Sequence, residues 1–63
     1  MNIRKFKGLL VENGLTYETF AQKIGVEKHT ISYLVRTKDL KVSLLVVIAD
    51  ALNVEPSVLI KKD

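Results

Sequence analysis

The chain contains no cysteine and no tryptophan, and it has a single proline and a single histidine. Without cysteine, neither a disulfide framework nor a thiolate zinc site can support the fold. The lone histidine has no cysteine beside it, and no two carboxylates share a helix face, so that a nucleophile with its base and a cluster of metal ligands are both missing. We therefore expect no enzyme, no metal site, no cofactor and no small-molecule substrate.

Long hydrophobic runs are also missing. The longest run, Leu44 to Ala49, has six residues, whereas a helix that spans a bilayer needs about 18 or more. Arg4, Lys5 and Lys7 lie near the start of the chain, but no apolar core of a secretory signal follows them. We expect no membrane segment and a cytoplasmic protein.

The 63 residues are enough for one compact domain, and we expect residues 1–63 to form it. A chain of this size buries only about 60% of the surface that its unfolded form exposes. Its hydrophobic content of 48% is nevertheless too high for a disordered tail. The packing of helices in a single small core must therefore stabilise the fold.

Charge is unevenly distributed along the chain. Ten basic and seven acidic residues give a formal net charge of +3. Most of the excess lies between Lys28 and Lys41, while the segment Val42–Ile60 has no cation and carries Asp50 and Glu55. A localised basic stripe suggests a polyanionic partner, although a net charge this low also suits an ordinary soluble surface.

Hydrophobic periodicity and capping signals predict five helices and no sheet. Thr16 is a suitable N-cap for the second helix, and Gly25 is a suitable left-handed residue after its end. Gly8 marks either a close helix contact or a weak point in the first helix. The predicted helices are Asn2–Glu12, Tyr17–Ile24, Lys28–Arg36, a fourth that Ser43 caps and that runs to Leu52 before Asn53, and Pro56–Ile60.

The fourth helix is the least certain assignment by propensity, because its valines and isoleucine favour a strand. No second strand is present to pair with it, and Leu45, Ile48 and Leu52 keep helical spacing. Val46 and Val47 then point outward. Either the last helix and the tail cover them, or a second copy of the chain does.

The second and third helices have the features of a helix-turn-helix unit, in which two short helices are joined by a three-residue turn containing glycine. Ala21 is small where the helices cross, Gly25 permits a positive φ, and Val26 fills the angle between them. Ile31 and Leu34 anchor the third helix in the core. The outward face of that helix then carries hydrogen-bonding side chains: Lys28, His29, Ser32, Tyr33 and Arg36.

At these residues the chain resembles the Cro/repressor-type helix-turn-helix family, the XRE-like relatives of lambda repressor. The run NGLTYETFAQKIGVEKHTISYL resembles the family's second and third helices, and VVIADALNVEPSVLI is similar to its fourth and fifth. The resemblance implies an all-α, five-helix, lambda-repressor-like DNA-binding domain. It also implies that the helix from Lys28 enters the major groove and that the start of the second helix touches phosphates.

Three positions depart from the family's usual pattern. Tyr17 stands where glutamine often contacts a phosphate, although a phenol can also donate to a phosphate oxygen. Glu27 replaces a serine or threonine cap, and its carboxylate either repels the DNA or accepts from a cytosine amino group. Val35-Arg36-Thr37 replaces Glu-Asn-Gly at the end of the third helix.

The exposed face of the third helix supplies the predicted base contacts, because a helix in the major groove reads bases with residues near its start. These are Lys28, His29, Ser32 and Tyr33. The predicted phosphate contacts are Thr16, Tyr17, Arg36, Lys38 and Lys41. Lys38 and Lys41 fit equally well as solubilising lysines, and the cations of the first helix are an alternative source of phosphate contacts.

These residues predict a sequence-specific DNA-binding transcriptional regulator, a repressor that occupies an operator. Double-stranded DNA is the expected partner, and a homodimer would read a pseudo-palindromic site. The predicted dimer interface comprises Val46, Val47, Pro56 and Ile60. The alternative is a protein-interaction module that retains the helix-turn-helix fold without operator specificity, as Tyr17, Glu27 and the low net charge would favour.

Overall fold

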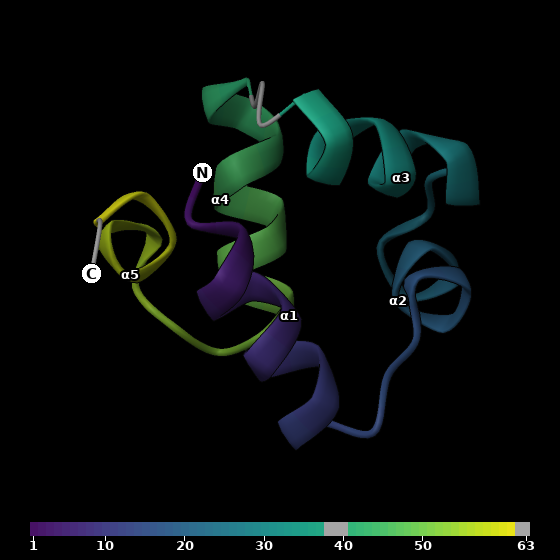
Figure 1. Ribbon diagram of the computed structural model, residues 1–63, viewed down its shortest axis with the longest axis horizontal. Helices are drawn as coiled ribbons and strands as arrows, with labels where there is room; N and C mark the ends of the chain where they lie inside the picture. Colours follow the sequence, from purple (N-terminus) through teal and green to yellow (C-terminus); the bar gives the residue numbers. More distant parts are fainter. Residues whose placement is uncertain (38–40, 62–63) are drawn as a thin grey trace.

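The computed structural model describes residues 1–37 and 41–61, and within these ranges all regular structure is helical, as predicted. The elements are α1 (Ile3–Glu12), α2 (Tyr17–Ile24), α3 (Lys28–Thr37), α4 (Val42–Ala51) and α5 (Pro56–Ile60). Figure 1 shows α4 near the centre, with α5 on one side of it and α2 and α3 on the other. The domain measures 26 × 23 × 18 Å along its principal axes.

A single core joins all five helices. Each helix contributes one large side chain that is essentially inaccessible to solvent, and these five are Phe6, Phe20, Ile31, Ile48 and Leu59. The rings of Phe6 and Phe20 meet edge to face at 5.6 Å between centroids. Burial of each such side chain stabilises the fold by about 1.5–3 kcal/mol. The core therefore fixes the position of α3 through Ile31 and the position of α5 through Leu59.

The first two helices begin with side-chain caps. Asn2 precedes α1 rather than starting it, and its side chain accepts a hydrogen bond from the Lys5 N–H at 3.0 Å. The predicted start of the first helix at Asn2 is therefore one residue early. Helix α2 has the predicted bounds and the predicted N-cap: Thr16 Oγ1 accepts from the Thr19 N–H, and Thr19 Oγ1 accepts from the Thr16 N–H.

Helix α3 is one residue longer than predicted. Thr37, which the sequence places in a loop, is its last residue, and the Thr37 hydroxyl donates to the Tyr33 carbonyl at 2.8 Å. The threonine side chain thus bonds to the carbonyl four residues earlier, a common arrangement for threonine in a helix. The last turn of α3 is thus held by a side chain of the same helix.

The predicted N-cap of the fourth helix is wrong. Helix α4 begins at Val42, so that Ser43 is inside the first turn, and Lys41 occupies the N-cap without a side-chain hydrogen bond. A lysine side chain has no acceptor for a backbone N–H, which leaves the helix start without the usual side-chain cap. The helix also ends at Ala51, one residue early, because Leu52 is the C-cap and Asn53 turns the chain with φ 58°.

The two ends of the described chain are joined through Asn2. The Asn2 backbone N–H donates to the Leu59 carbonyl at 2.6 Å, and its Nδ2 donates to the Lys61 carbonyl at 2.8 Å. These bonds satisfy carbonyls at the end of α5, which is only five residues long. The short terminal helix is therefore attached to the start of α1 by hydrogen bonds as well as by the buried Leu59.

Gly8 is a weak point of α1 and not a close helix contact. A Cβ placed on this residue would meet no atom within 4 Å. No helix in residues 1–37 and 41–61 has the length and hydropathy needed to cross a bilayer.

Candidate nucleic-acid interface

The turn between α2 and α3 sets the angle between the two helices. Gly25 adopts a left-handed conformation, with φ 76° and ψ 31°, which an L side chain rarely accepts. The Val26 N–H then donates to the Ala21 carbonyl at 2.9 Å. Ala21 is buried and Val26 packs against the core. The turn therefore has the backbone bonds and the small residue that the sequence predicts for a helix-turn-helix unit.

Helix α3 buries one face and exposes the other. Ile31 and Leu34 are 0% and 4% exposed, which anchors the helix to the core. The opposite face carries four of the five side chains predicted there, namely Lys28, His29, Tyr33 and Arg36, all exposed. Ser32 differs, because it is only partly exposed. Because the Ser32 side chain is short, the longer side chains of its neighbours form the exposed surface of this face.

The start of α3 presents charges of both signs. His29 Nδ1 lies 3.4 Å from Glu27 Oε2, and the two side chains are about 80% exposed. An ion pair so open to water, present only when the imidazole is protonated, contributes little to stability. The Glu27 side chain is thus directed to His29, and Lys28 beside it carries a further positive charge.

Tyr33 and Arg36 form the other half of the exposed α3 face. The Arg36 guanidinium carbon lies 5.8 Å from the centroid of the Tyr33 ring, a cation–π arrangement. Tyr33 is 50% exposed, so that the ring presents both an aromatic surface and a phenol to a partner. Arg36 is therefore restricted by its neighbour on the same helix face.

A hollow where α2 and α3 begin brings together three predicted site residues from two helices. Thr16, Tyr17 and Lys28 line it, and Glu18 is its fourth lining residue. Tyr17 is only partly exposed, because its ring stacks on Phe6 at 6.5 Å between centroids. This packing fixes the ring at the edge of the core and explains how a tyrosine is accommodated at the first position of α2.

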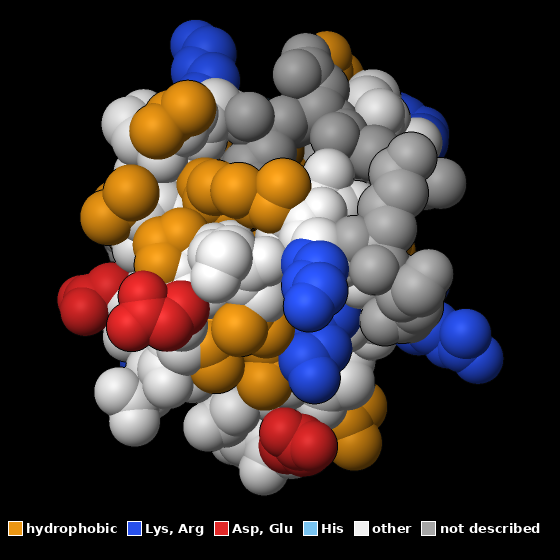
Figure 2. Space-filling view, turned by 90° about the vertical axis from the view of Figure 1, so that its left-hand side faces the viewer, with side chains coloured by type: hydrophobic (Ala, Val, Ile, Leu, Met, Phe, Trp, Pro, Cys, Tyr) orange, Lys and Arg blue, Asp and Glu red, His pale blue; other side chains and the backbone are white. Residues whose placement is uncertain are grey.

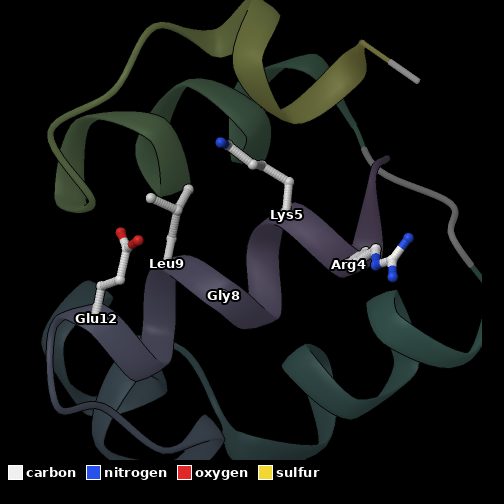
Figure 3. A pocket seen from close by; sticks show the side chains of 5 residues that line it. All are labelled: Arg4, Lys5, Gly8, Leu9 and Glu12. Atoms are coloured by element: carbon white, nitrogen blue, oxygen red, sulfur yellow. The ribbon is translucent and has the colours of Figure 1, made fainter. Parts of the chain in front are cut away.

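The remaining predicted phosphate contacts lie further along the chain. Lys41 is exposed at the start of α4, whereas Lys38 lies outside the described residues. The cations of α1 form a separate group: Figure 3 shows Arg4 and Lys5 pointing in different directions beside a second hollow, with Glu12 at its far end. Neither Arg4 nor Lys5 lines the hollow at the start of α3.

The predicted dimer residues are partly exposed. Val46, Val47 and Ile60 are 51%, 44% and 58% exposed, and Pro56 is half-buried. Figure 2 faces the side of the molecule that carries α5 and shows hydrophobic side chains gathered between acidic side chains at the left edge and basic ones at centre right. The outward direction of Val46 and Val47 is as predicted.

Sequence reasoning missed one part of this surface. A groove beside α3 is lined by Thr30, Tyr33, Leu34, Lys41 and Leu44. Thr30 precedes Tyr33 by three residues, the spacing that makes neighbours on a helix, and this spacing was the available signal. Leu44 comes from the next helix, and its contribution depends on how α4 packs, which no local pattern specifies.

Comparison with known proteins identifies one family. The sequence profile of the Cro/C1-type HTH DNA-binding domain matches residues 5–61, from α1 to the residue after α5. No match was found among curated proteins. No solved structure matched either. The matched range includes both helices of the helix-turn-helix unit and the turn between them.

Proposed function

Because the chain belongs to the Cro/C1-type helix-turn-helix DNA-binding family, its function is that of a DNA-binding regulator, and we propose that it represses transcription by inserting α3 into the major groove of an operator. In this proposal residues 1–63 act as one domain. The regulator works by occupying DNA rather than by catalysis.

The observation that carries the proposal is the division of α3 into two faces. Ile31 and Leu34 are buried, while Lys28, His29 and Tyr33 are exposed together on the other side. Lysine suits guanine O6 and N7, an imidazole donates to a purine N7, and an aromatic ring packs on a thymine methyl. Ser32 is a weaker candidate for base contact than the sequence suggests, because it is partly covered.

We propose that the hollow at the start of α2 and α3 binds a phosphate group of the DNA backbone. Thr16 and Tyr17 supply two hydroxyl groups at this place, and the positive charge of Lys28, proposed above as a base contact, lies beside them. Phosphate contacts of this kind position a protein on the duplex. Arg36 and Lys41 extend the contacts along the backbone, and each neutralised phosphate steepens the slope of log affinity against log salt by about 0.9.

The proposal is tested by footprinting an operator, found by random-library selection, in the presence of random duplex competitors. Lys28→Ala and Tyr33→Ala should each cost about 1–3 kcal/mol of discrimination at one base pair. Thermal unfolding should change little, because both side chains are exposed. Lys61→Ala, which removes the same charge beyond α5, is the matched control and should retain operator preference.

A second candidate function rests on the acidic side chains near the start of α3. Glu18 lines the hollow with Lys28, and the Glu27 carboxylate lies beside His29. Carboxylates at this edge oppose phosphates and would suit a protein partner instead. Retention on heparin and on duplex at low salt separates the two functions, since a module that binds only proteins should elute near the void volume.

We also propose that two copies pair through Val46, Val47, Pro56 and Ile60. Their exposed apolar surface supports the pairing. A two-fold pair would place two α3 helices about 34 Å apart, one helical turn of DNA, and would read a pseudo-palindrome. A symmetric consensus in the selected duplexes would agree with this arrangement, and a consensus without symmetry would contradict it.

A further inference from the structure

A groove between α3 and the start of α4 adjoins the predicted base contacts, because Tyr33 is one of its lining residues. It has a volume of about 310 Å³ and is lined by Thr30, Tyr33, Leu34, Lys41 and Leu44. Only Tyr33 and Lys41 among these belong to the contacts proposed above. The groove therefore adds surface to the interface that the roles already assigned do not use.

Leu34 and Leu44 form the floor of the groove, and Tyr33 forms an exposed wall. Leu34 is 4% exposed and belongs to the core, and Leu44 packs against that core. Tyr33 is half-exposed, with Arg36 over its ring and the Thr37 hydroxyl bonded to its carbonyl. Of these two contacts only that of Arg36 involves the Tyr33 ring, and it restricts the ring that forms the wall.

The described lining of the groove carries charge of one sign. Among these residues Lys41 has the one formal charge, and none is a carboxylate. Thr30 and Tyr33 add two hydroxyl groups. An apolar floor beside an ammonium group and two hydroxyls complements an occupant that carries a small apolar group next to an anion.

A thymidine of bound DNA has this combination. The C5-methyl of thymine is the apolar group that the base pairs present in the major groove, and each nucleotide also carries a phosphate. Because Tyr33 lies on both the groove and the exposed α3 face, the groove is continuous with the surface that meets the bases. Its volume exceeds that of a methyl group, which leaves room for part of the deoxyribose.

We infer that this groove receives a thymidine of the operator, with Thr30 and Tyr33 against the C5-methyl and Lys41 on the phosphate of the same strand. Thr30 is then a specificity-determining residue. The inference rests on the proposed function, since it requires α3 to face the major groove. It assigns a role to Thr30, which the proposed base and phosphate contacts leave out.

The experiment replaces the thymines of the selected operator, one at a time, by deoxyuridine, which lacks only the methyl group. At one thymine of a half-site the affinity of the unaltered protein should fall about fourfold, the value expected for one buried methyl group. This substitution changes the DNA alone, and the result does not depend on the folding of a variant.

The protein side of the test uses Thr30→Ser, which removes the threonine methyl and keeps the hydroxyl. This variant should prefer the thymine operator over the uracil operator by less than the unaltered protein does, because Tyr33 still contacts the C5-methyl, and its thermal unfolding should confirm that it is folded. Thr37→Ser is the matched control, because Thr37 lies on α3 but does not line the groove. The control should retain the fourfold preference.

Two results would overturn the inference and leave the proposed function intact: specific operator binding with no thymine sensitive to uracil, or a Thr30→Ser variant whose preference for thymine at the sensitive position is as large as that of the unaltered protein. Absence of any specific duplex binding would overturn both.

Discussion

At the scale of single residues, Asn2 combines three structural roles. Its side-chain oxygen caps α1, its Nδ2 bonds the Lys61 carbonyl, and its backbone N–H bonds the Leu59 carbonyl. Substitution of an N-cap asparagine by alanine costs about 0.5–2 kcal/mol. The additional bond to Lys61 places Asn2 at the upper part of this range.

We therefore expect Asn2→Ala to lower the free energy of unfolding by about 1–2 kcal/mol, measured by urea denaturation. Asn2→Asp is the control, because a carboxylate still caps α1 but cannot donate to the Lys61 carbonyl. Its loss should be smaller than that of alanine. Equal losses for the two variants would mean that the cap contributes nothing measurable.

Two glycines give a second prediction, with opposite signs for the same substitution. Gly8→Ala should raise the free energy of unfolding by up to about 1 kcal/mol, because alanine favours the helix and the added Cβ meets no atom within 4 Å. Gly25→Ala should lower it by about 1–2 kcal/mol, because φ is 76° there. Chemical denaturation of both variants measures these two changes in the free energy of unfolding. A Gly25→Ala variant more stable than the unaltered protein would contradict the left-handed turn.

At the scale of elements, the start of α4 illustrates a conflict between stability and binding. Lys41 is the N-cap without a side-chain hydrogen bond, and it is also a proposed phosphate contact. Asparagine and aspartate are much better N-caps than residues without a side-chain acceptor. The sequence thus has a weak cap at a position where a positive charge would serve DNA binding.

We expect Lys41→Asp to raise the free energy of unfolding by about 1 kcal/mol while it weakens DNA binding and lowers the salt slope by about 0.9. Thermal unfolding and duplex titrations at several salt concentrations measure the two effects. Ser43→Ala, two residues further along, is the control. It should change the stability and the salt slope little, because Ser43 is an exposed residue in the first turn of α4 and not its N-cap. A variant that gains stability and keeps its salt slope would exclude Lys41 as a phosphate contact.

The helix-turn-helix unit and the core were predictable because local rules specify them. Thr16 and Gly25 mark the ends of α2, and periodicity identified Ile31 and Leu34 as buried residues. The start of α4 was not predictable in this way. Ser43 is the better cap by propensity, but the N-cap is Lys41, two residues earlier, so capping preference does not locate this helix start.

The candidate site was predictable where it depends on one helix and less so where it depends on two. Lys28, His29 and Tyr33 lie on the exposed face of α3 as spacing predicts. Ser32 is partly covered, and the groove between Thr30 and Leu44 joins residues of different helices. Such a groove follows from how α4 packs against the rest of the domain, which periodicity does not specify.

At the scale of the whole molecule, the proposed pairing of two copies makes the affinity for a full operator depend on Val46 and Val47. These residues are half-exposed on α4, while Ile48 on the same helix is fully buried. A charged residue at an exposed position changes the stability of the monomer by only about 0.5 kcal/mol. The same charge in an apolar interface would have to lose its water.

We expect Val47→Asp to sediment as a monomer at concentrations where the unaltered protein is a dimer, and to lose affinity for a symmetric operator more than for a half-site. Analytical ultracentrifugation and titrations with both duplexes measure this. Val11→Asp, at a valine that is 78% exposed on α1, is the matched control and should leave both properties unchanged. Identical behaviour of the two variants would exclude this face as the interface.

The hydrogen bonds of Asn2 have a practical consequence for labelling and immobilisation. They hold both described ends of the chain side by side, and Figure 1 shows these ends at the edge opposite α2 and α3. A fluorophore or a surface tether attached at either end would start on the side of α4 that faces away from α2 and α3. Single-molecule experiments can therefore use either attachment point without obstructing the approach of a duplex.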